Sequence, residues 1–511
     1  MRIVLLNPPY HAVTSRYGTG EQVPLGLLSI GGALLDAGYD VRLVDAEARH
    51  LPVDEAVNQV IDLAPDLLMT GHAGSTPAHA TVVAATRAIK ELCPNVPIVY
   101  GGIYPTYHGR DILEAEPSVD VIVRGEGELT AVRVATAMEH QRPLADIHGI
   151  MFRDESRIVE TAPAEMLIDL DNLRVGWELI DNWDLYKCWG LGRSAIVQLS
   201  RGCPHQCTYC GQRGYWSRWR YRTPELVAEE IAWLHRNHGV NFVDLADENP
   251  TTARGVWRRF LNALIAEKLP VKLFATLRAS DIVRDRDNLH LYKQAGFECF
   301  LMGMETMDEA TMQRIRKGSS QQKDYEAVQL LRQHGILSMV GHVAGFEDEK
   351  FLDYWRSFRQ LLLYDPDLIN AMYVTPHRWT PFYEESAERR VVMEDSSKWD
   401  YRHQLLATKH LKPWQVFLSI KTIELLVQIR PKVIWRLLFG SDESIRRAYR
   451  WCVRNAAKVW LDEIHDFVFR SKYSSKPRTL IAFWGRPRPD LEYALNTPPN
   501  VKRKHQSNRR A

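Results

Sequence analysis

Short apolar runs alternate with amphipathic segments over the first part of the chain. Each run has the length of a strand, and the segment after it has the apolar spacing of a helix. The runs that predict buried strands are residues 2–7, 40–46, 66–71, 97–102 and 119–125, and the predicted helices are 25–38, 53–64, 77–93 and 109–116. This alternation predicts an α/β fold with a doubly wound, Rossmann-like parallel sheet in residues 1–140, which binds ligands at the carboxyl ends of its strands.

The turns after the third, fourth and fifth predicted strands are rich in small residues. Their sequences are GHAGSTP, GGIYPTYHG and RGEGE. Small residues let a backbone approach a flat or bulky ligand closely, although any one of these turns could need glycine only for its own backbone. The residues that we expect to contact such a ligand are Gly71, Gly74, Ser75, Gly101, Gly102, Gly125 and Glu126.

A second series of strand–helix units follows a less regular stretch. Residues 141–190 predict a hairpin and a linker laid over a surface, and the strands expected after them are 194–199, 241–246, 271–276, 298–303, 337–342 and 368–374. Six such units predict a partial (β/α)6 barrel of the TIM type in residues 191–395, with its active site at the carboxyl ends of the strands. Residues 396–470 are helical, aromatic and basic; packing on the barrel is favoured over lying on a membrane surface, because charges interleave with apolar residues.

Charge is distributed unevenly along the 511 residues, whose net charge is +2. Lys and Arg crowd the tail 471–511, which we expect to be disordered; a basic arm that touches anionic membrane or nucleic acid is the alternative. The remaining body is slightly acidic, which argues against an enzyme of nucleic acids. The start of the chain lacks the features of a secretory signal, and no apolar run reaches 18 residues, so a cytoplasmic location is expected.

Three of the seven cysteines fall within eight residues, at Cys203, Cys207 and Cys210. They follow the first predicted barrel strand and therefore lie in a loop at the barrel mouth. Three thiolates can hold three irons of a [4Fe-4S] cubane, which leaves the fourth iron without a protein ligand. Structural zinc is the alternative, but it favours four ligands in pairs, and the sequence has no second CxxC or HxxxH pair.

The Cys-x3-Cys-x2-Cys spacing, with Tyr209 before the last cysteine, resembles the radical S-adenosylmethionine superfamily. The resemblance implies that the open iron binds S-adenosylmethionine and that the cofactor yields a radical which removes hydrogen from unactivated carbon. It also implies cofactor-binding roles at the barrel strand ends. The residues concerned are Tyr209, Asp247, Glu248, Asn249, Thr276, Arg278, Glu305 and Gly345, each of which could instead be an ordinary strand-end cap.

The amino-terminal domain joined ahead of such a barrel resembles the cobalamin-binding members of that superfamily. The phrases NPP, PLGLLSIGGALLDAG, GGIYPT and VRGEGE carry the resemblance. The chain departs from the better-known corrinoid motif, since Asp-x-His-x-x-Gly is absent after the first strand. The expected cobalamin would then be bound by backbone and small residues, with no histidine placed to ligate cobalt.

Within this class, the phrases RGCPHQCTYCGQRGYWSRWRYRTPELVAEEI, FVDLADENPT and NAMYVTPHRWTPFYEE resemble the anaerobic magnesium-protoporphyrin IX monomethyl ester cyclases of bacteriochlorophyll synthesis. The resemblance implies oxygen-independent oxidative closure of the fifth ring, with a keto oxygen from water and an electron donor such as flavodoxin or ferredoxin. A cobalamin-dependent C-methyltransferase of tetrapyrroles or hopanoids is the main alternative, and a non-catalytic corrinoid sensor is a remote one. A flat macrocycle also wants aromatic walls and carboxylate partners. The residues proposed for these roles are Trp216, Trp219, Tyr373, Trp379, Phe382, Arg213, Arg218 and Arg378, with His377 a weaker candidate for a magnesium ligand.

Overall fold

A computed structural model describes residues 1–10, 20–72, 76–155, 157–216, 218–440 and 443–486. Its amino-terminal domain is the predicted doubly wound sheet, which the strand order β2-β1-β3-β4-β5-β6-β7 confirms. The first five strands run parallel, and the predicted hairpin adds two antiparallel strands at the edge. The strands are β1 (Arg2–Asn7), β2 (Asp40–Asp45), β3 (Leu67–Gly71), β4 (Ile98–Gly101), β5 (Val121–Val123), β6 (Ile150–Asp154) and β7 (Arg157–Glu160). Their helices are α2 (Leu25–Asp36), α3 (Val53–Asp62), α4 (Thr76–Leu92), α5 (Ile103–Ala115) and α6 (Glu128–Glu139).

Helix α5 begins six residues earlier than the apolar spacing predicts. The stretch GGIYPTYHG was expected to be a loop, but it is helical from Ile103 onward. Gly102, with φ of +112°, makes the sharp turn before the helix, and Pro105 sits in the first turn, where its missing N–H has no partner to lose. Tyr104 and Tyr107 are buried, so tertiary packing stabilises this helix although its glycines and proline are typical of a loop.

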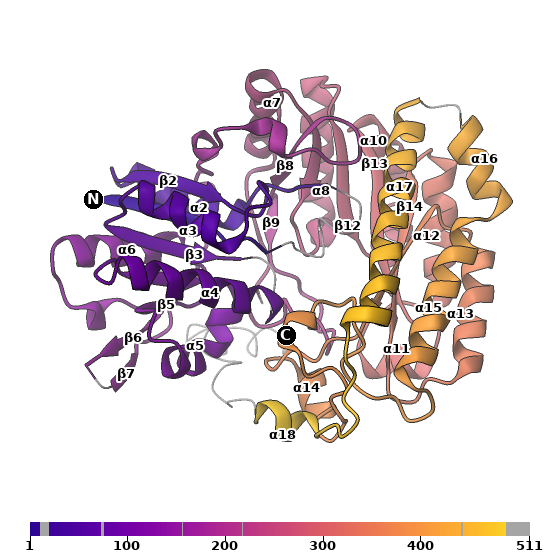
Figure 1. The fold of residues 1–511 in the computed structure, drawn as a ribbon. Coiled ribbons are helices and arrows are strands. Elements are labelled where there is room, and N and C mark those ends of the chain that lie inside the picture. The colour runs from indigo at the N-terminus through magenta and orange to yellow at the C-terminus, as the bar shows by residue number, and fades with distance from the viewer. Residues whose placement is uncertain (11–19, 73–75, 156, 217, 441–442, 487–511) are drawn as a thin grey trace, which may run out of the picture.

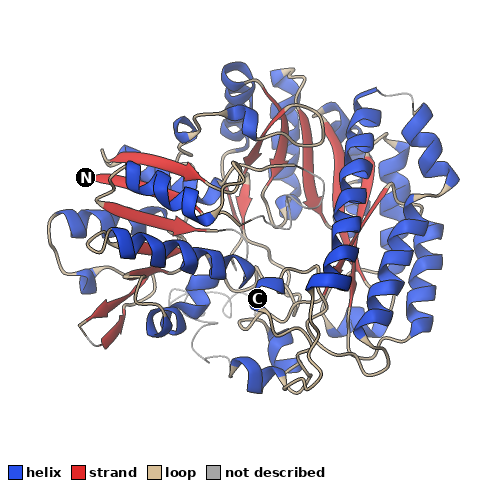
Figure 2. Ribbon diagram, in the orientation of Figure 1, coloured by secondary structure: helices blue, strands red, loops and turns tan. Residues whose placement is uncertain are grey.

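The second domain is an open barrel of six parallel strands in the order β15-β14-β13-β12-β11-β8 (Figures 1 and 2). The strands are β8 (Arg193–Val197), β11 (Val240–Leu245), β12 (Lys272–Leu277), β13 (Phe297–Glu305), β14 (Leu337–Ala344) and β15 (Leu368–Tyr373). The helices between them are α7 (Pro224–His238), α8 (Arg254–Glu267), α9 (Ala279–Arg284), α10 (Leu289–Gln294), α11 (Glu309–Arg314), α12 (Gln321–Gln333) and α13 (Phe351–Tyr364). Apolar side chains of strands and helices share one core, which confirms the predicted (β/α)6 arrangement.

The stretch between the two domains exposes many of its polar residues but buries its aromatic side chains. Trp177, Trp183 and Tyr186 join the core of the barrel. The Tyr186 hydroxyl donates to the Asp45 carboxylate at 2.7 Å, which ties this stretch to the end of β2. The aromatic residues of this stretch therefore attach one domain to the other.

The carboxyl-terminal region wraps the barrel with helices α15 (Pro413–Gln428), α16 (Pro431–Phe439) and α17 (Glu443–His465) (Figure 1). One face of α15 enters the barrel core through Val416, Ile420 and Ile423, as the packing interpretation expects. The expectation of a disordered tail from Ser471 does not hold for residues 471–486, because α18 (Leu480–Trp484) buries Leu480 completely. Residues 487–511 lie outside the described part of the chain.

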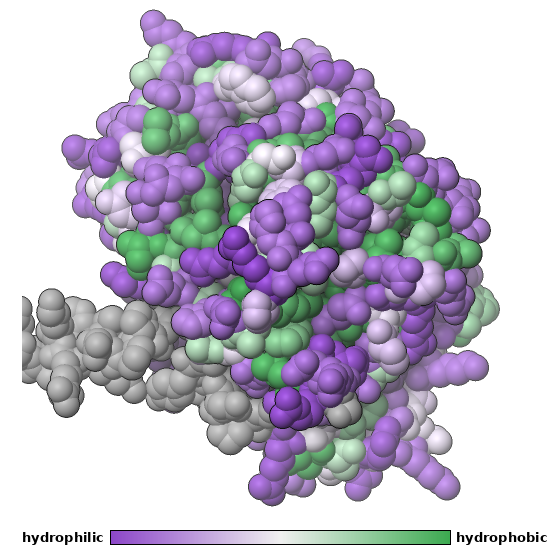
Figure 3. Space-filling view, turned by 90° about the vertical axis from the view of Figure 1, so that its left-hand side faces the viewer, coloured by the Kyte–Doolittle hydropathy of each residue, from purple (hydrophilic) through white to green (hydrophobic). Residues whose placement is uncertain are grey.

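The side of the molecule that carries the amino-terminal domain is mostly hydrophilic, with hydrophobic residues in between (Figure 3). No helix within the described ranges is long and apolar enough to cross a membrane.

Candidate functional site

The three clustered cysteines lie in a loop whose base is a two-stranded ribbon, β9 (Ser200–Arg201) and β10 (Arg220–Tyr221). Other parts of the barrel hold the loop from outside. The Thr208 amide donates to the Ile315 carbonyl at 3.0 Å, and the Trp379 indole donates to the Gly211 carbonyl at 2.8 Å. The loop is therefore fixed at its base and on two sides.

The three thiols of the loop are free and largely enclosed. Cys207 is buried, whereas Cys203 and Cys210 are half-buried. Burial raises the pKa of the Cys210 thiol to about 11, with smaller contributions from Cys207 and Cys203 nearby. Among the described residues, no three His, Cys, Asp or Glu side chains converge on one point that could hold a single metal ion. A cubane asks for less convergence, because each cysteine binds its own iron.

A buried network of polar groups lies beside this loop. Glu305, at the end of β13, accepts from the Lys317 ammonium at 2.5 Å and lies beside Tyr209 of the cysteine loop. Burial, and then the Glu305 carboxylate, raise the pKa of the Tyr209 hydroxyl. Arg278, after β12, donates to the carbonyl of Lys317. The structure thus brings the predicted residues Tyr209, Arg278 and Glu305 together.

Lys317 was not predicted, because it belongs to no motif and follows a helix rather than a strand. It is one of the groups whose charge reaches the thiols of Cys207 and Cys210. A cation beside thiols favours their deprotonated form, which is the form that binds iron.

Three predicted residues after β11 have different surroundings. Asp247 accepts from the amides of Leu199 and Ser200, so its carboxylate fixes the backbone that leads into the cysteine loop. Glu248 accepts from the Gly202 amide at 3.1 Å, and burial raises its pKa to about 8. Asn249 is buried, and its amide nitrogen has no hydrogen-bond partner among the described residues. Asp247 is thus committed to the protein, whereas Asn249 keeps a donor for a ligand.

Two further predicted residues, Thr276 and Gly345, lie at the carboxyl ends of β12 and β14. Thr276 is half-buried at the end of β12. Gly345, with φ of +89°, donates from its amide to Glu349 at 2.8 Å and accepts from Arg389 at 2.8 Å. Gly345 therefore makes a turn that only glycine adopts easily.

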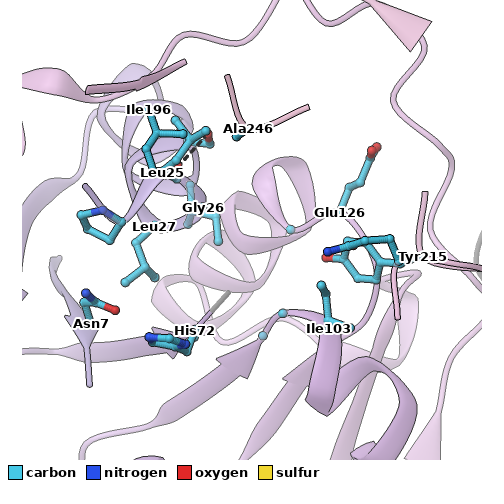
Figure 4. Close-up of a pocket in the computed structure, with 18 of the residues that line it drawn as sticks. Asn7, Leu25, Gly26, Leu27, His72, Ile103, Glu126, Ile196, Tyr215 and Ala246 are labelled. Atoms are coloured by element: carbon cyan, nitrogen blue, oxygen red, sulfur yellow. Dashed lines mark hydrogen bonds between the residues drawn. The ribbon is translucent and has the colours of Figure 1, made fainter. Parts of the chain in front are cut away.

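A cavity of about 570 Å³ lies where the carboxyl ends of both sheets meet (Figure 4). The amino-terminal domain contributes four of the glycines predicted to contact a ligand, Gly71, Gly101, Gly102 and Gly125, while Gly74 and Ser75 lie outside the described residues. From the barrel, Ile196 and Ala246 line the cavity near Leu25 and Gly26 of helix α2 (Figure 4). A side chain at Gly26 would meet no atom within 4 Å. Small residues and open space on both walls suit a bulky, flat ligand.

Two polar atoms in the cavity wall have no hydrogen-bond partner among the described residues. The Trp216 indole nitrogen and the Gln212 side-chain oxygen are buried without a hydrogen bond. Buried polar groups are rarely left unpaired, so these atoms indicate a ligand. Gln212 follows Cys210 by two residues, which places the cavity wall directly beside the cysteine loop.

Glu126 lines the cavity but is held in an interdomain ion pair. Its carboxylate accepts two hydrogen bonds from the Arg220 guanidinium, at 2.9 and 2.6 Å. Next to it, Arg201 donates to Glu128 at 2.5 Å. These four buried side chains clamp the turn after β5 to the ribbon under the cysteine loop. The Glu126 carboxylate, which was predicted to contact a cofactor, is therefore already hydrogen-bonded to Arg220.

The candidates for substrate contact divide into two groups. Trp216, Trp379 and His377 line the cavity, where His377 stacks on Trp379 at 4.8 Å. The other candidates are absent from the cavity lining: Trp219, Tyr373, Phe382, Arg213, Arg218 and Arg378. Arg378, for example, pairs with Asp111 at 2.6 Å.

Two further cavity residues were missed. Tyr401 shares a 2.6 Å hydrogen bond with His377, and burial lowers the pKa of His377 to about 3, so the imidazole is neutral at ordinary pH. His72, after β3, lies 3.0 Å from the Glu47 carboxylate in the cavity wall. His72 follows the third strand rather than the first, and the prediction that no histidine ligates cobalt stays a prediction.

Comparisons with known proteins agree with this arrangement. Residues 197–358 match the Radical SAM superfamily, and residues 13–135 match the B12 binding domain. The chain is 50% identical over 97% of its length, and 99% of the relative's, to the anaerobic magnesium-protoporphyrin IX monomethyl ester cyclase of Synechocystis sp.. It is 32% identical to the enzyme of that name from Cereibacter sphaeroides, over 80% of this chain and 68% of the relative. The Hopanoid C-3 methylase of Methylococcus capsulatus is 24% identical over 76% of this chain and 73% of its own.

Solved structures share the fold. The radical S-adenosylmethionine methyltransferase TsrM from Kitasatospora setae superposes with a TM-score of 0.70 at 17% identity, over 91% of this chain and 98% of its own. The cobalamin-dependent S-adenosylmethionine radical enzyme OxsB gives 0.66 at 15% identity, over 96% of this chain and 84% of its own.

Proposed function

The chain belongs to the family of the anaerobic magnesium-protoporphyrin IX monomethyl ester cyclases, which are radical S-adenosylmethionine proteins with a B12-binding domain, and we propose that it closes the fifth ring of that porphyrin ester without dioxygen. The observation that carries the proposal is the 50% identity over nearly the whole of both chains. Its cofactors are a [4Fe-4S] cluster, S-adenosylmethionine and cobalamin. A low-potential electron donor such as flavodoxin or ferredoxin completes the proposed system.

The residues around the cysteine loop have assigned tasks in this proposal. When bound, the reduced cluster and S-adenosylmethionine supply a carbon radical that removes hydrogen from a saturated carbon, and cobalamin supplies a second reactive centre. Cys203, Cys207 and Cys210 hold the cluster. Lys317 and Arg278 place positive charge beside the thiols and so favour thiolates. We assign Asn249, with its unpaired buried amide, to the S-adenosylmethionine that the open iron would hold.

The two walls of the cavity would bind different ligands. Glycines on the amino-terminal side let a corrin approach the backbone, and Trp216 on the barrel side offers an aromatic surface to a porphyrin. The hydrogen-bonded pair His377 and Tyr401 presents neutral polar groups at the cavity wall, because burial keeps the imidazole uncharged.

Weighing the product tests the proposal against its rival. Anaerobically reconstituted protein is incubated with magnesium-protoporphyrin IX monomethyl ester, cobalamin, S-adenosylmethionine and a reductant in ¹⁸O-labelled water. Ring closure predicts a product that has lost four hydrogens and gained one labelled oxygen, a six-electron oxidation. A gain of one methyl group would instead select the methyltransferase activity named for the hopanoid relative. The Cys207→Ala variant is the control for cluster-independent chemistry.

A further inference from the structure

The outer surface of the carboxyl-terminal helices carries a set of exposed aromatic and aliphatic side chains. Helices α13, α15 and α16 each bury one face and leave large apolar residues on the other. The six residues that define this surface, here called the outer apolar face, are Phe351, Trp355, Trp414, Leu418, Trp435 and Phe439. Each is more than half exposed, at between 51% and 69% of its full area.

The spacing of these residues shows that they form faces rather than scattered exceptions. Each helix contributes a pair four residues apart, and residues four apart lie one above the other on a helix. Helix α13 packs beside α15, and α16 follows α15 after a two-residue turn, so the three helices lie on the same side of the barrel (Figure 1). Soluble monomers rarely leave an apolar area of this extent without a use.

The charges around this face are predominantly positive. Residues 350–364 and 412–439 together hold eight Lys or Arg and two Asp or Glu. Four of these cations are neutralised by ion pairs: Arg356 with Asp353, Lys421 with Glu424 and Glu463, and both Arg430 and Arg436 with Asp365. Arg359 and Lys432, by contrast, are exposed beside the apolar residues. The face therefore combines apolar anchors with a cationic rim.

We propose that the outer apolar face docks the protein on the surface of a bilayer that bears anionic headgroups. Helices that lie in a membrane interface combine Trp, Phe and Leu on one face with Lys and Arg beside them. Aromatic side chains are suited to the headgroup region, and Lys or Arg adds attraction to anionic lipid.

Flotation of the full-length, anaerobically reconstituted protein with vesicles tests the docking. The vesicles are phosphatidylcholine alone or equal parts phosphatidylcholine and phosphatidylglycerol. Wild-type protein is expected to float with the anionic vesicles and to be released by high salt. Trp435→Ser/Phe439→Ser should reduce the bound fraction roughly tenfold, because two interfacial anchors are lost. Arg359→Gln/Lys432→Gln should weaken anionic binding about 25-fold, at roughly fivefold for each charge removed.

Trp233→Ser supplies the matched control, because Trp233 is an exposed aromatic on α7, away from this face. It should float like the wild type, and circular dichroism should show all variants folded. Two results would overturn the proposal: wild-type protein that ignores anionic vesicles, or flotation unchanged by the α16 variant. Light scattering tests whether a second copy of the chain covers the face instead. A dimer that Trp435→Ser/Phe439→Ser dissociates would assign the face to that second copy. Vesicle binding needs no turnover, so its failure is distinct from failure of the proposed reaction.

Discussion

Replacing Arg201 by Met tests whether the buried clamp between the domains holds the cysteine loop in place. The guanidinium donates to Glu128 at 2.5 Å and lies 3.6 Å from Glu126, and both carboxylates are buried. Methionine keeps most of the apolar stem but removes the charge. Glu126 retains Arg220, whereas Glu128 loses its hydrogen-bonded partner. Removing one member of a buried ion pair costs about 3–5 kcal/mol.

The loss should depend on pH in a defined direction. Burial acts to raise the pKa of Glu128, but the neighbouring Arg201 outweighs burial and holds the pKa below its usual value. A lowered folded pKa contributes stability that is present above the unfolded pKa and lost as pH falls through the folded one. Without Arg201, burial dominates and the pKa of Glu128 rises. The variant's deficit should therefore be largest at neutral pH and shrink towards pH 4.5, the ordinary value of this carboxyl.

Urea unfolding followed by tryptophan fluorescence measures the deficit at several pH values. Arg259→Met is the matched control, because Arg259 pairs with Glu225 at a similar distance, 2.6 Å, but on the surface, where a pair is worth about 0–1 kcal/mol. The double variant Arg201→Met/Glu128→Gln should recover much of the lost stability at neutral pH. A deficit as small as that of Arg259→Met, or one that does not change with pH, would refute the reasoning.

Three further changes test the cysteine loop, the cavity and a buried acid. Cys207→Ala should abolish bound iron and sulfide after reconstitution, whereas Cys93→Ala, outside the loop, should leave both unchanged; a full cluster in the first variant would contradict the assignment. Gly26→Phe should weaken cobalamin retention, measured by absorbance, by about tenfold or more, because the new side chain enters the cavity. Gly255→Phe is the control, since Gly255 is equally open but lies on α8, and it should have no effect. Retention that Gly26→Phe leaves unchanged would place the corrin elsewhere. Burial raises the pKa of Glu349 from 4.5 to about 7, so the stability that its protonated form contributes below pH 4.5 is lost as pH rises through about 7. Glu349→Gln should therefore be more stable than wild type at pH 8 by up to about 3 kcal/mol in urea unfolding, and coinciding pH profiles would exclude this cause.

The strand–helix order and the cysteine loop could be predicted because both are local in sequence. Alternating apolar periods mark the strands, and the three cysteines stand within eight residues. Helix α5 was missed in its first turns, because the burial of Tyr104 and Tyr107 is decided by distant segments. Local pattern predicts an element well where its own residues determine it.

Side-chain roles at the strand ends were harder to predict, because their partners are far away in the chain. Position after a strand places Glu126 and Asp247 at the correct edge. It does not reveal that Arg220, 94 residues from Glu126, occupies the first carboxylate, or that the backbone near Ser200 occupies the second. Lys317 and Tyr401 were missed for the same reason, since only the fold brings them to the site.

The cysteine loop has two sides, and this connects the cluster to the cavity. Cys210 belongs to the proposed iron site, whereas Gly211 and Gln212, the next two residues, form cavity wall. The Gly211 carbonyl accepts from Trp379, whose ring is itself part of that wall. A ligand that contacts Trp379 from the cavity would therefore lie one hydrogen bond and one residue from a cluster ligand. Because Tyr107 of α5 stacks on the same indole at 4.5 Å, the amino-terminal domain also helps to set its position. Both domains thus fix the aromatic surface that a substrate would share with the iron loop.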